Sequence, residues 1–247
     1  MNTDGRPPVR IAHAYGNSKQ SLDRALQAPV DVIEVDVWHR GGDLYIHHER
    51  RLGPLPVLAD KRMRGHPPGR FTVPLWNRYY LRPDVNRLHL RELLRTVDGG
   101  RHLLLDLKGS YRGKRLEECA RTLAGVIREH AAQGWVAVCG QDFGALDGFR
   151  AAAPDIEVRY SMEQPQQWRR FQEMVTNGEP VRRICIEHRF LDDEKLRFIQ
   201  REDVSLYCWT VDDAMEAERL VAAGADGIIS NDLTLLASLH PRQPASG

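Results

Sequence analysis

The stretch Val32–Val37 (VIEVDV) alternates apolar and acidic residues and predicts a buried β-strand. Residues two apart on a strand point to the same side, so Glu34 and Asp36 share one face and the apolar residues share the other. Two carboxylates held together away from water are costly unless a cation neutralises them. This stretch therefore predicts a strand of a covered sheet that carries two ligands for a cation.

A second stretch, Leu103–Lys108 (LLLDLK), repeats the pattern, with Asp106 and Lys108 on one face and leucines on the other. Asp106 can supply a third oxygen ligand, and Lys108 can contact an anionic oxygen of a substrate. An internal ion pair between Asp106 and Lys108 is the alternative. Ligands that are all oxygen atoms favour a hard cation, and we expect one divalent ion, Mg²⁺ or Ca²⁺.

Around these two stretches, short apolar runs alternate with longer amphipathic patterns typical of helices. Continuous apolar runs are expected for parallel strands that are covered on both sides. Eight strands alternating with helices over this length favour a single α/β domain, a (β/α)₈ TIM-type barrel. The predicted strands are residues 9–13, 32–37, 103–108, 136–139, 157–161, 183–187, 205–210 and 227–230.

Composition excludes several classes of protein. The 247 residues include 35 Lys and Arg against 34 Asp and Glu, so no strong field attracts nucleic acid, and no nucleic-acid partner is expected. No apolar run reaches the roughly 18 to 20 residues that a bilayer-spanning helix needs. The four cysteines are widely spaced, and the N-terminal residues lack a signal-peptide pattern. We therefore expect reduced cysteines and a cytoplasmic protein, while the oligomeric state is not indicated.

Residues 49–87 interrupt the alternation of strands and helices. This segment holds nine Lys and Arg against three acidic residues, and it includes Trp76, Tyr79 and Tyr80. Long insertions in a barrel are usually lids or binding loops, so a lid after the second strand is predicted, with possible peripheral contact to a lipid surface. A solvated insertion without a role is the alternative. Residues 240–247 are expected to form a disordered tail.

Histidines supply candidates for proton transfer. His13 ends the first predicted strand, at the same rim as the carboxylates, and His47 and His48 end the short stretch 44–48. A neutral imidazole can accept or donate a proton near neutral pH. Five other histidines are interpreted as structural: His39, His66, His89, His102 and His130. His188 differs, because it follows a strand that ends at Glu187. Either of these two residues could reach the mouth of the barrel and help to select the substrate.

The order of these motifs resembles that of the glycerophosphodiester phosphodiesterases. IAH at 11–13, EVD at 34–36 and HHE at 47–49 resemble the opening of that family, and LLLDLK at 103–108 resembles its acidic-x-Lys strand. YCWTVDDAMEAERLVAAGADGIISND at 207–232 is similar to the end of the family pattern. Sphingomyelinase D, from the same phospholipase-C-like superfamily, shares the layout, including the Asp-x-Lys form.

The resemblance implies roles for individual residues. Glu34, Asp36 and Asp106 would bind one divalent cation, and Lys108 would contact the phosphate. The acid/base or nucleophile pair would be His13 and His48. We prefer His48 to His47 because Glu49 matches the acidic residue that follows the family's histidine, and His47 stays a candidate for substrate binding. Trp209, at a strand end, would wall the substrate pocket, or would simply pack inside the barrel.

The sequence departs from the family after the first histidine. Ala14–Ser18 stand where the family has Arg-Gly and then Pro-Glu-Asn-Thr, and Asn17 or Gln20 is a poor counterpart of that glutamate. The missing arginine removes a bidentate contact to phosphate, which Arg40 could replace. This departure leaves the headgroup specificity open.

These observations predict metal-dependent hydrolysis of a phosphodiester, foremost a glycerophosphodiester. One alternative keeps the chemistry and changes the substrate to a lysolipid or sphingomyelin-like diester, as in a lysophospholipase D. The other alternative is a barrel that binds phosphodiesters or nucleic acid without turnover. Three acidic residues brought together beside a lysine favour the enzymes, since simple binding needs no such cluster.

Overall fold

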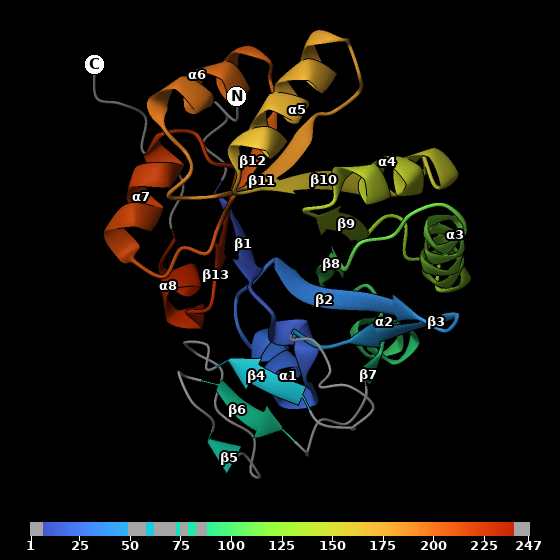
Figure 1. The fold of residues 1–247 in the computed structure, drawn as a ribbon. Coiled ribbons are helices and arrows are strands. Elements are labelled where there is room, and N and C mark those ends of the chain that lie inside the picture. The colour runs from blue at the N-terminus through green and yellow to red at the C-terminus, as the bar shows by residue number, and fades with distance from the viewer. Residues whose placement is uncertain (1–6, 49–57, 62–72, 75–78, 83–87, 240–247) are drawn as a thin grey trace.

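The computed structural model describes residues 7–48, 58–61, 73–74, 79–82 and 88–239. Eight parallel strands form a closed barrel, because β1 pairs with β2 on one side and with β13 on the other (Figure 1). The predicted (β/α)₈ barrel is confirmed, with all eight expected strands in place. In order around the ring, the strands are β1 (Val9–Ala12), β2 (Val32–Arg40), β8 (His102–Lys108), β9 (Val136–Gly140), β10 (Glu157–Met162), β11 (Arg183–Glu187), β12 (Ser205–Trp209) and β13 (Gly227–Ser230).

In the described part of the chain, one α-helix follows each barrel strand or its extensions and covers the outside of the sheet. Several helices begin at a side chain that accepts a backbone N–H, as Ser18 does for the first and Asp213 for the seventh. The helices are α1 (Lys19–Gln27), α2 (Leu90–Val97), α3 (Lys114–Glu129), α4 (Phe143–Ala152), α5 (Pro165–Thr176), α6 (Asp193–Arg201), α7 (Ala214–Ala222) and α8 (Leu233–Ser238). None of the helices in these ranges is both long and apolar enough to span a membrane.

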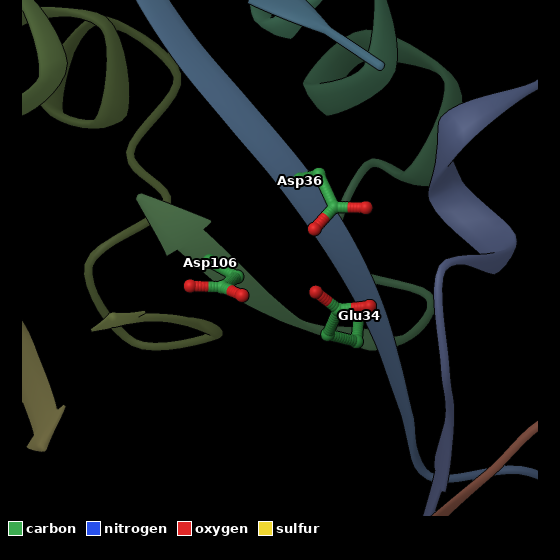
Figure 2. Close-up of side chains that lie close together, drawn as sticks. All are labelled: Glu34, Asp36 and Asp106. Atoms are coloured by element: carbon green, nitrogen blue, oxygen red, sulfur yellow. The ribbon is translucent and has the colours of Figure 1, made fainter. Parts of the chain in front are cut away.

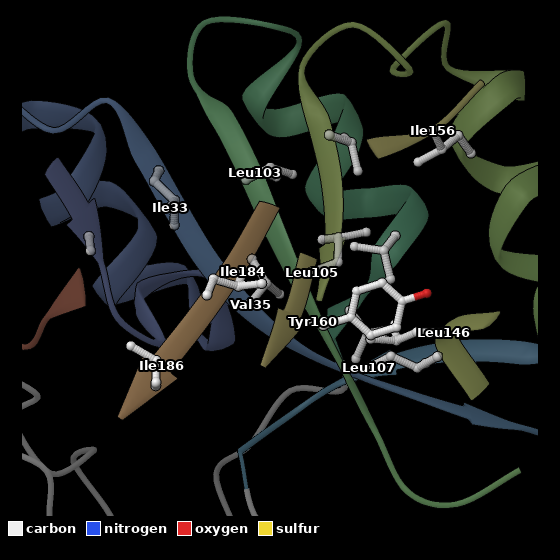
Figure 3. Close-up of a cluster of buried hydrophobic side chains, with 14 of the residues drawn as sticks. Ile33, Val35, Leu103, Leu105, Leu107, Leu146, Ile156, Tyr160, Ile184 and Ile186 are labelled. Carbon is white, nitrogen blue, oxygen red and sulfur yellow. The ribbon is translucent and has the colours of Figure 1, made fainter. Parts of the chain in front are cut away.

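The alternation along each strand separates two cores. Side chains such as Ile33 and Val35 point outward and pack with the helices, together with leucines of β8 (Figure 3). A smaller cluster fills the barrel interior and includes Ile11, Leu104 and Tyr207. All four cysteines are free and buried, as expected for small apolar side chains in these cores.

The described residues between β2 and α2 form further short strands. β3 (Asp43–Ile46) forms an antiparallel hairpin with β2, and β7 (Leu88–His89) pairs with β3. Within the predicted lid, β4 (Leu58–Lys61), β5 (Val73–Pro74) and β6 (Tyr79–Arg82) form a small antiparallel sheet outside the barrel (Figure 1). The side chain of Trp76 and the tail 240–247 lie outside the described residues, so the predicted lid contact and disorder stay predictions.

Candidate active site

Three carboxylates meet inside the barrel at the carboxyl ends of two neighbouring strands. Glu34 and Asp36 come from β2, and Asp106 comes from β8, where it is the register partner of Asp36. Their ligand oxygens all lie within 4.8 Å of one another (Figure 2). Glu34 is 4% exposed and Asp36 is fully buried, as the alternation of VIEVDV predicts. The apolar residues of β2 face the helices, so the acidic face must look inward.

Burial and mutual repulsion shape the charge of this cluster. Burial, with the nearby charges of Asp36 and Asp106, raises the pKa of Glu34 well above its usual value. Burial also acts to raise the pKa of Asp36, but Lys108, His48 and His13 together outweigh it, and the net pKa is lowered. Lys108 Nζ lies 2.8 Å from Asp36 Oδ1 and also pairs with Asp106. The internal ion pair considered for Lys108 is therefore present, and it includes Asp36 as well.

The donor set fits a hard divalent cation. One lysine ammonium faces three carboxylates, so it cannot neutralise all of them. The oxygens converge from two rigid strands, and oxygen ligands of this kind suit Mg²⁺ and Ca²⁺. Glu34, Asp36 and Asp106 are the residues that could hold such an ion.

Two histidines face each other beside the carboxylates. The rings of His13 and His48 have centroids 6.5 Å apart and are nearly perpendicular, at 88°. His13 Nε2 lies 4.0 Å from Glu34 Oε2, and burial lowers the pKa of His13, which favours a neutral ring. His47 instead stacks on Trp38, with ring centroids 5.4 Å apart. This geometry places His48, rather than His47, opposite His13.

A network of hydrogen bonds connects His13 to Asn231 and Asp212, and the sequence analysis did not identify it. His13 Nδ1 lies 2.9 Å from Asn231 Oδ1, although the two residues are 218 positions apart. The Asn231 side-chain amide and backbone N–H both donate to Asp212, which also accepts from Ser230. Asn231 directly follows β13 and lies two residues after Ile229 of the interior cluster, so the period of two was a signal for its inward direction. Asp212 precedes Asp213, the residue that caps α7, and its carboxylate accepts the hydrogen bonds of this network.

The segment after His13 supports the carboxylates from a short 3₁₀ turn (Tyr15–Asn17). Ala14 adopts a left-handed conformation, with φ of 57°, and its N–H donates to Glu34 Oε2 at 2.5 Å. The Asn17 amide donates to Asp36 Oδ2 at 2.5 Å, while Asn17 Oδ1 accepts from the Asp36 backbone N–H. Asn17 thus has a definite role in holding Asp36, although the sequence comparison had made it only a poor counterpart of the family's glutamate.

The opposite side of the mouth carries the candidates Glu187 and Trp209. Glu187 ends β11 and Trp209 ends β12, where the two residues are register partners. Each lies two residues after a member of the interior cluster, and Trp209 packs against that cluster. Glu187 Oε2 accepts the N–H of Phe190 at 2.9 Å. Arg40 lies at the exposed hairpin end of β2, four residues beyond Asp36, or about 13 Å at the usual strand rise.

Comparison with known proteins agrees with this geometry. Residues 10–235 match the glycerophosphoryl diester phosphodiesterase family. The chain belongs to this family. The glycerophosphodiester phosphodiesterase GDPD4 of Arabidopsis thaliana is 26% identical over 255 residues, which cover 94% of this chain and 73% of the plant protein.

Solved structures of other phosphodiesterases share the fold. One is a phosphodiesterase from Oleispira antarctica in complex with the product sn-glycerol-3-phosphate, with 20% identity and a TM-score of 0.69; the match covers 93% of this chain and 95% of that one. Another is a glycerophosphodiester phosphodiesterase from Thermotoga maritima, with 14% identity and a TM-score of 0.66, covering 93% and 97% of the two chains.

Membership of the glycerophosphodiester phosphodiesterase family makes the chain an enzyme, a phosphoric diester hydrolase. The alternative of a barrel that only binds is therefore not supported. Within this phosphodiesterase, Ala14 occupies the position after the first histidine, and it contributes its backbone N–H to Glu34 rather than a guanidinium to the substrate.

Proposed function

We propose that this phosphodiesterase hydrolyses glycerophosphodiesters with the help of a divalent cation, and that His13 and His48 transfer the protons. The observation that carries the proposal is the pair of imidazoles facing each other, 6.5 Å apart, beside three converging carboxylates. Hydrolysis of a diester requires one proton to leave the attacking oxygen and one to reach the departing alcohol. Two imidazoles on either side of a bound phosphate supply both transfers.

Each residue has a part that follows from its position. A cation held by Glu34, Asp36 and Asp106 would stabilise the charge that develops on the phosphate oxygens. His13 serves as the base, because its lowered pKa keeps the ring neutral and ready to accept a proton from water or from a substrate hydroxyl. His48 protonates the departing alcohol. Lys108 contacts a phosphate oxygen with its ammonium group.

Alanine variants test the two histidines. His13→Ala and His48→Ala should each lower kcat by about two to four powers of ten if they transfer protons. His47→Ala should cost far less, because its ring stacks on Trp38. His130→Ala is the matched control and should keep native turnover, because His130 Nδ1 contacts the Val126 carbonyl oxygen at the end of α3. Native turnover by His48→Ala, together with a severe loss in His47→Ala, would reverse the choice between the two.

To test which diester is the substrate, a panel of diesters is assayed for hydrolysis with Mg²⁺, with Ca²⁺ and after the cation is removed by a chelator. Water-soluble glycerophosphocholine and micellar lysophosphatidylcholine separate the proposed substrate from the lysolipid alternative. We expect turnover of the soluble diester with added cation and none in chelator. A clear preference for micelles that disappears when Trp76, Tyr79 and Tyr80 are replaced would instead support the lipid substrate and a membrane contact through residues 49–87.

A further inference from the structure

Glu187 and Trp209 form a pair that the proposed chemistry does not use. They are register partners at the carboxyl ends of adjacent strands, which lie about 4.8 Å apart in a sheet. Both follow interior residues by two positions, Cys185 and Tyr207, so a carboxylate and an indole stand side by side on the inner face of the barrel mouth. Both are partly exposed, which leaves them open to a molecule in the mouth.

This pair lies opposite the carboxylates that would receive the phosphate. Around the closed ring, β11 is four strands from β2 in either direction, and β12 is four strands from β8. The interior of an eight-stranded barrel is wide enough for side chains or for one small ligand. A diester bound with its phosphate at Asp36 and Asp106 would therefore extend one of its alcohols toward Glu187 and Trp209.

The carboxylate of this pair has no lysine or arginine beside it among the described residues. Glu187 makes no ion pair with lysine or arginine in those ranges, and His188 Nε2 lies 3.9 Å from Glu187 Oε1. The indole of Trp209, beside this carboxylate, offers an aromatic ring that is partly exposed. A carboxylate beside an indole is the arrangement that recognises quaternary ammonium groups, through ionic attraction and cation–π contact.

We propose that Glu187 and Trp209 form a subsite for a quaternary ammonium group on the alcohol of the diester. The inference rests on the proposed function, because it assumes that the phosphate binds at the carboxylate cluster. It assigns to this enzyme a preference for choline-type diesters over diesters of neutral alcohols. Lys108 contacts the phosphate on one side of the mouth, and Glu187 attracts the cationic alcohol on the other.

The test compares kcat/KM for glycerophosphocholine and glycerophosphoglycerol, which share the phosphate and one glycerol and differ in the charge of the second alcohol. The native enzyme should prefer the choline diester by about five- to thirtyfold, the range expected for a desolvated cation–π contact. Glu187→Gln should reduce the preference to within about twofold. The glutamine oxygen can still accept the Phe190 N–H, so the turn after β11 is kept.

Three further variants complete the series. Trp209→Leu should remove the preference, whereas Trp209→Phe, which retains an aromatic ring, should keep most of it. Glu173→Gln makes the same charge change on the exposed side of α5 and should keep the native ratio. A thermal unfolding midpoint measured for each variant shows whether it is folded. A native preference that neither Glu187→Gln nor Trp209→Leu reduces would overturn the subsite, as would equal use of both diesters by the native enzyme.

A binding measurement separates this inference from the proposed hydrolysis. Calorimetry with phosphocholine and with inorganic phosphate reports on the subsite without any turnover. Tighter binding of phosphocholine that is lost in Glu187→Gln supports the subsite even if neither diester is cleaved, and in that case the proposed function fails alone. Equal affinity for the two compounds, in an enzyme that does hydrolyse diesters, would remove the subsite and leave the function intact.

Discussion

Asn231 Oδ1 lies 2.9 Å from His13 Nδ1, and the Asn231 amide nitrogen donates to Asp212 at 2.9 Å. Burial acts to raise the pKa of Asp212, but the hydrogen bonds from Asn231 and Ser230 outweigh it and lower that pKa. An ionised Asp212 can only accept, so it fixes the amide with its oxygen toward His13. The proton of neutral His13 then resides on Nδ1, and the lone pair of Nε2 faces Glu34 and the mouth.

Asn231→Ala should therefore lower kcat by about ten- to hundredfold, the usual cost of losing a partner that orients a functional side chain. KM should change less, because Asn231 does not contact the mouth directly in this scheme. Asp212→Asn should have a smaller effect of the same kind, since an amide can still accept from Asn231. Steady-state kinetics over a range of pH checks both variants. A change confined to KM would contradict an orienting role for Asn231.

Removal of one carboxylate should abolish the response to the cation. The native protein is expected to unfold at a higher temperature with Mg²⁺ or Ca²⁺, because an ion that binds only the folded state stabilises it. Asp106→Asn should remove that rise and most of the turnover. Asp155→Asn, at a surface ion pair with Arg128, is the control and should keep the rise. Thermal unfolding with cation and with chelator gives the answer, and a persistent rise in Asp106→Asn would show that the ion binds elsewhere.

Gly16 permits the close approach of the turn after His13 to β2. A Cβ atom at this position would lie 2.2 Å from Cγ2 of Val35, so Gly16→Ala should cost about 1 to 3 kcal/mol of stability and displace Asn17 from Asp36. Gly125→Ala, at an exposed position of α3 with nothing within 4 Å, should instead stabilise by up to about 1 kcal/mol. Urea unfolding of both variants measures the contrast. If Gly16→Ala and Gly125→Ala were equally stable, the turn after His13 would accommodate the added methyl group without cost, against this prediction.

The ionisation of Glu216 should make the stability of the folded protein depend on pH in the acid range. Hydrogen bonds from Arg219, with a further one from His188, lower the pKa of Glu216 to about 2. The folded state therefore favours the ionised form, so the contribution is complete above the usual pKa of about 4.5 and is lost as pH falls toward 2. Glu216→Gln should be less stable than the native protein at pH 7 and equal to it near pH 2. Glu218→Gln, exposed on the same helix, should show no such pH-dependent difference in urea midpoints.

Local patterns were sufficient to predict the elements and their faces. The apolar and acidic alternation of Val32–Val37 is a property of the pleat, and it correctly turned Glu34 and Asp36 away from the helices. The same period of two placed Asp106 and Lys108 on one side of their strand. Residues 49–87 were harder to interpret, because short strands such as β4 and β6 have little apolar periodicity of their own.

The sequence by itself therefore determined the barrel and the face of its second strand that carries the carboxylates, because strand and helix periodicities are local. Only the tertiary structure decided that Asp36 is in register with Asp106 and that Asn231 reaches His13, and it placed His48, which the family resemblance had favoured, opposite His13. These relationships depend on which distant strands pair and in what register. The pairing of β1 with both β2 and β13 closes the barrel and fixes these registers. The pattern of residues within a single strand does not specify which strand it pairs with.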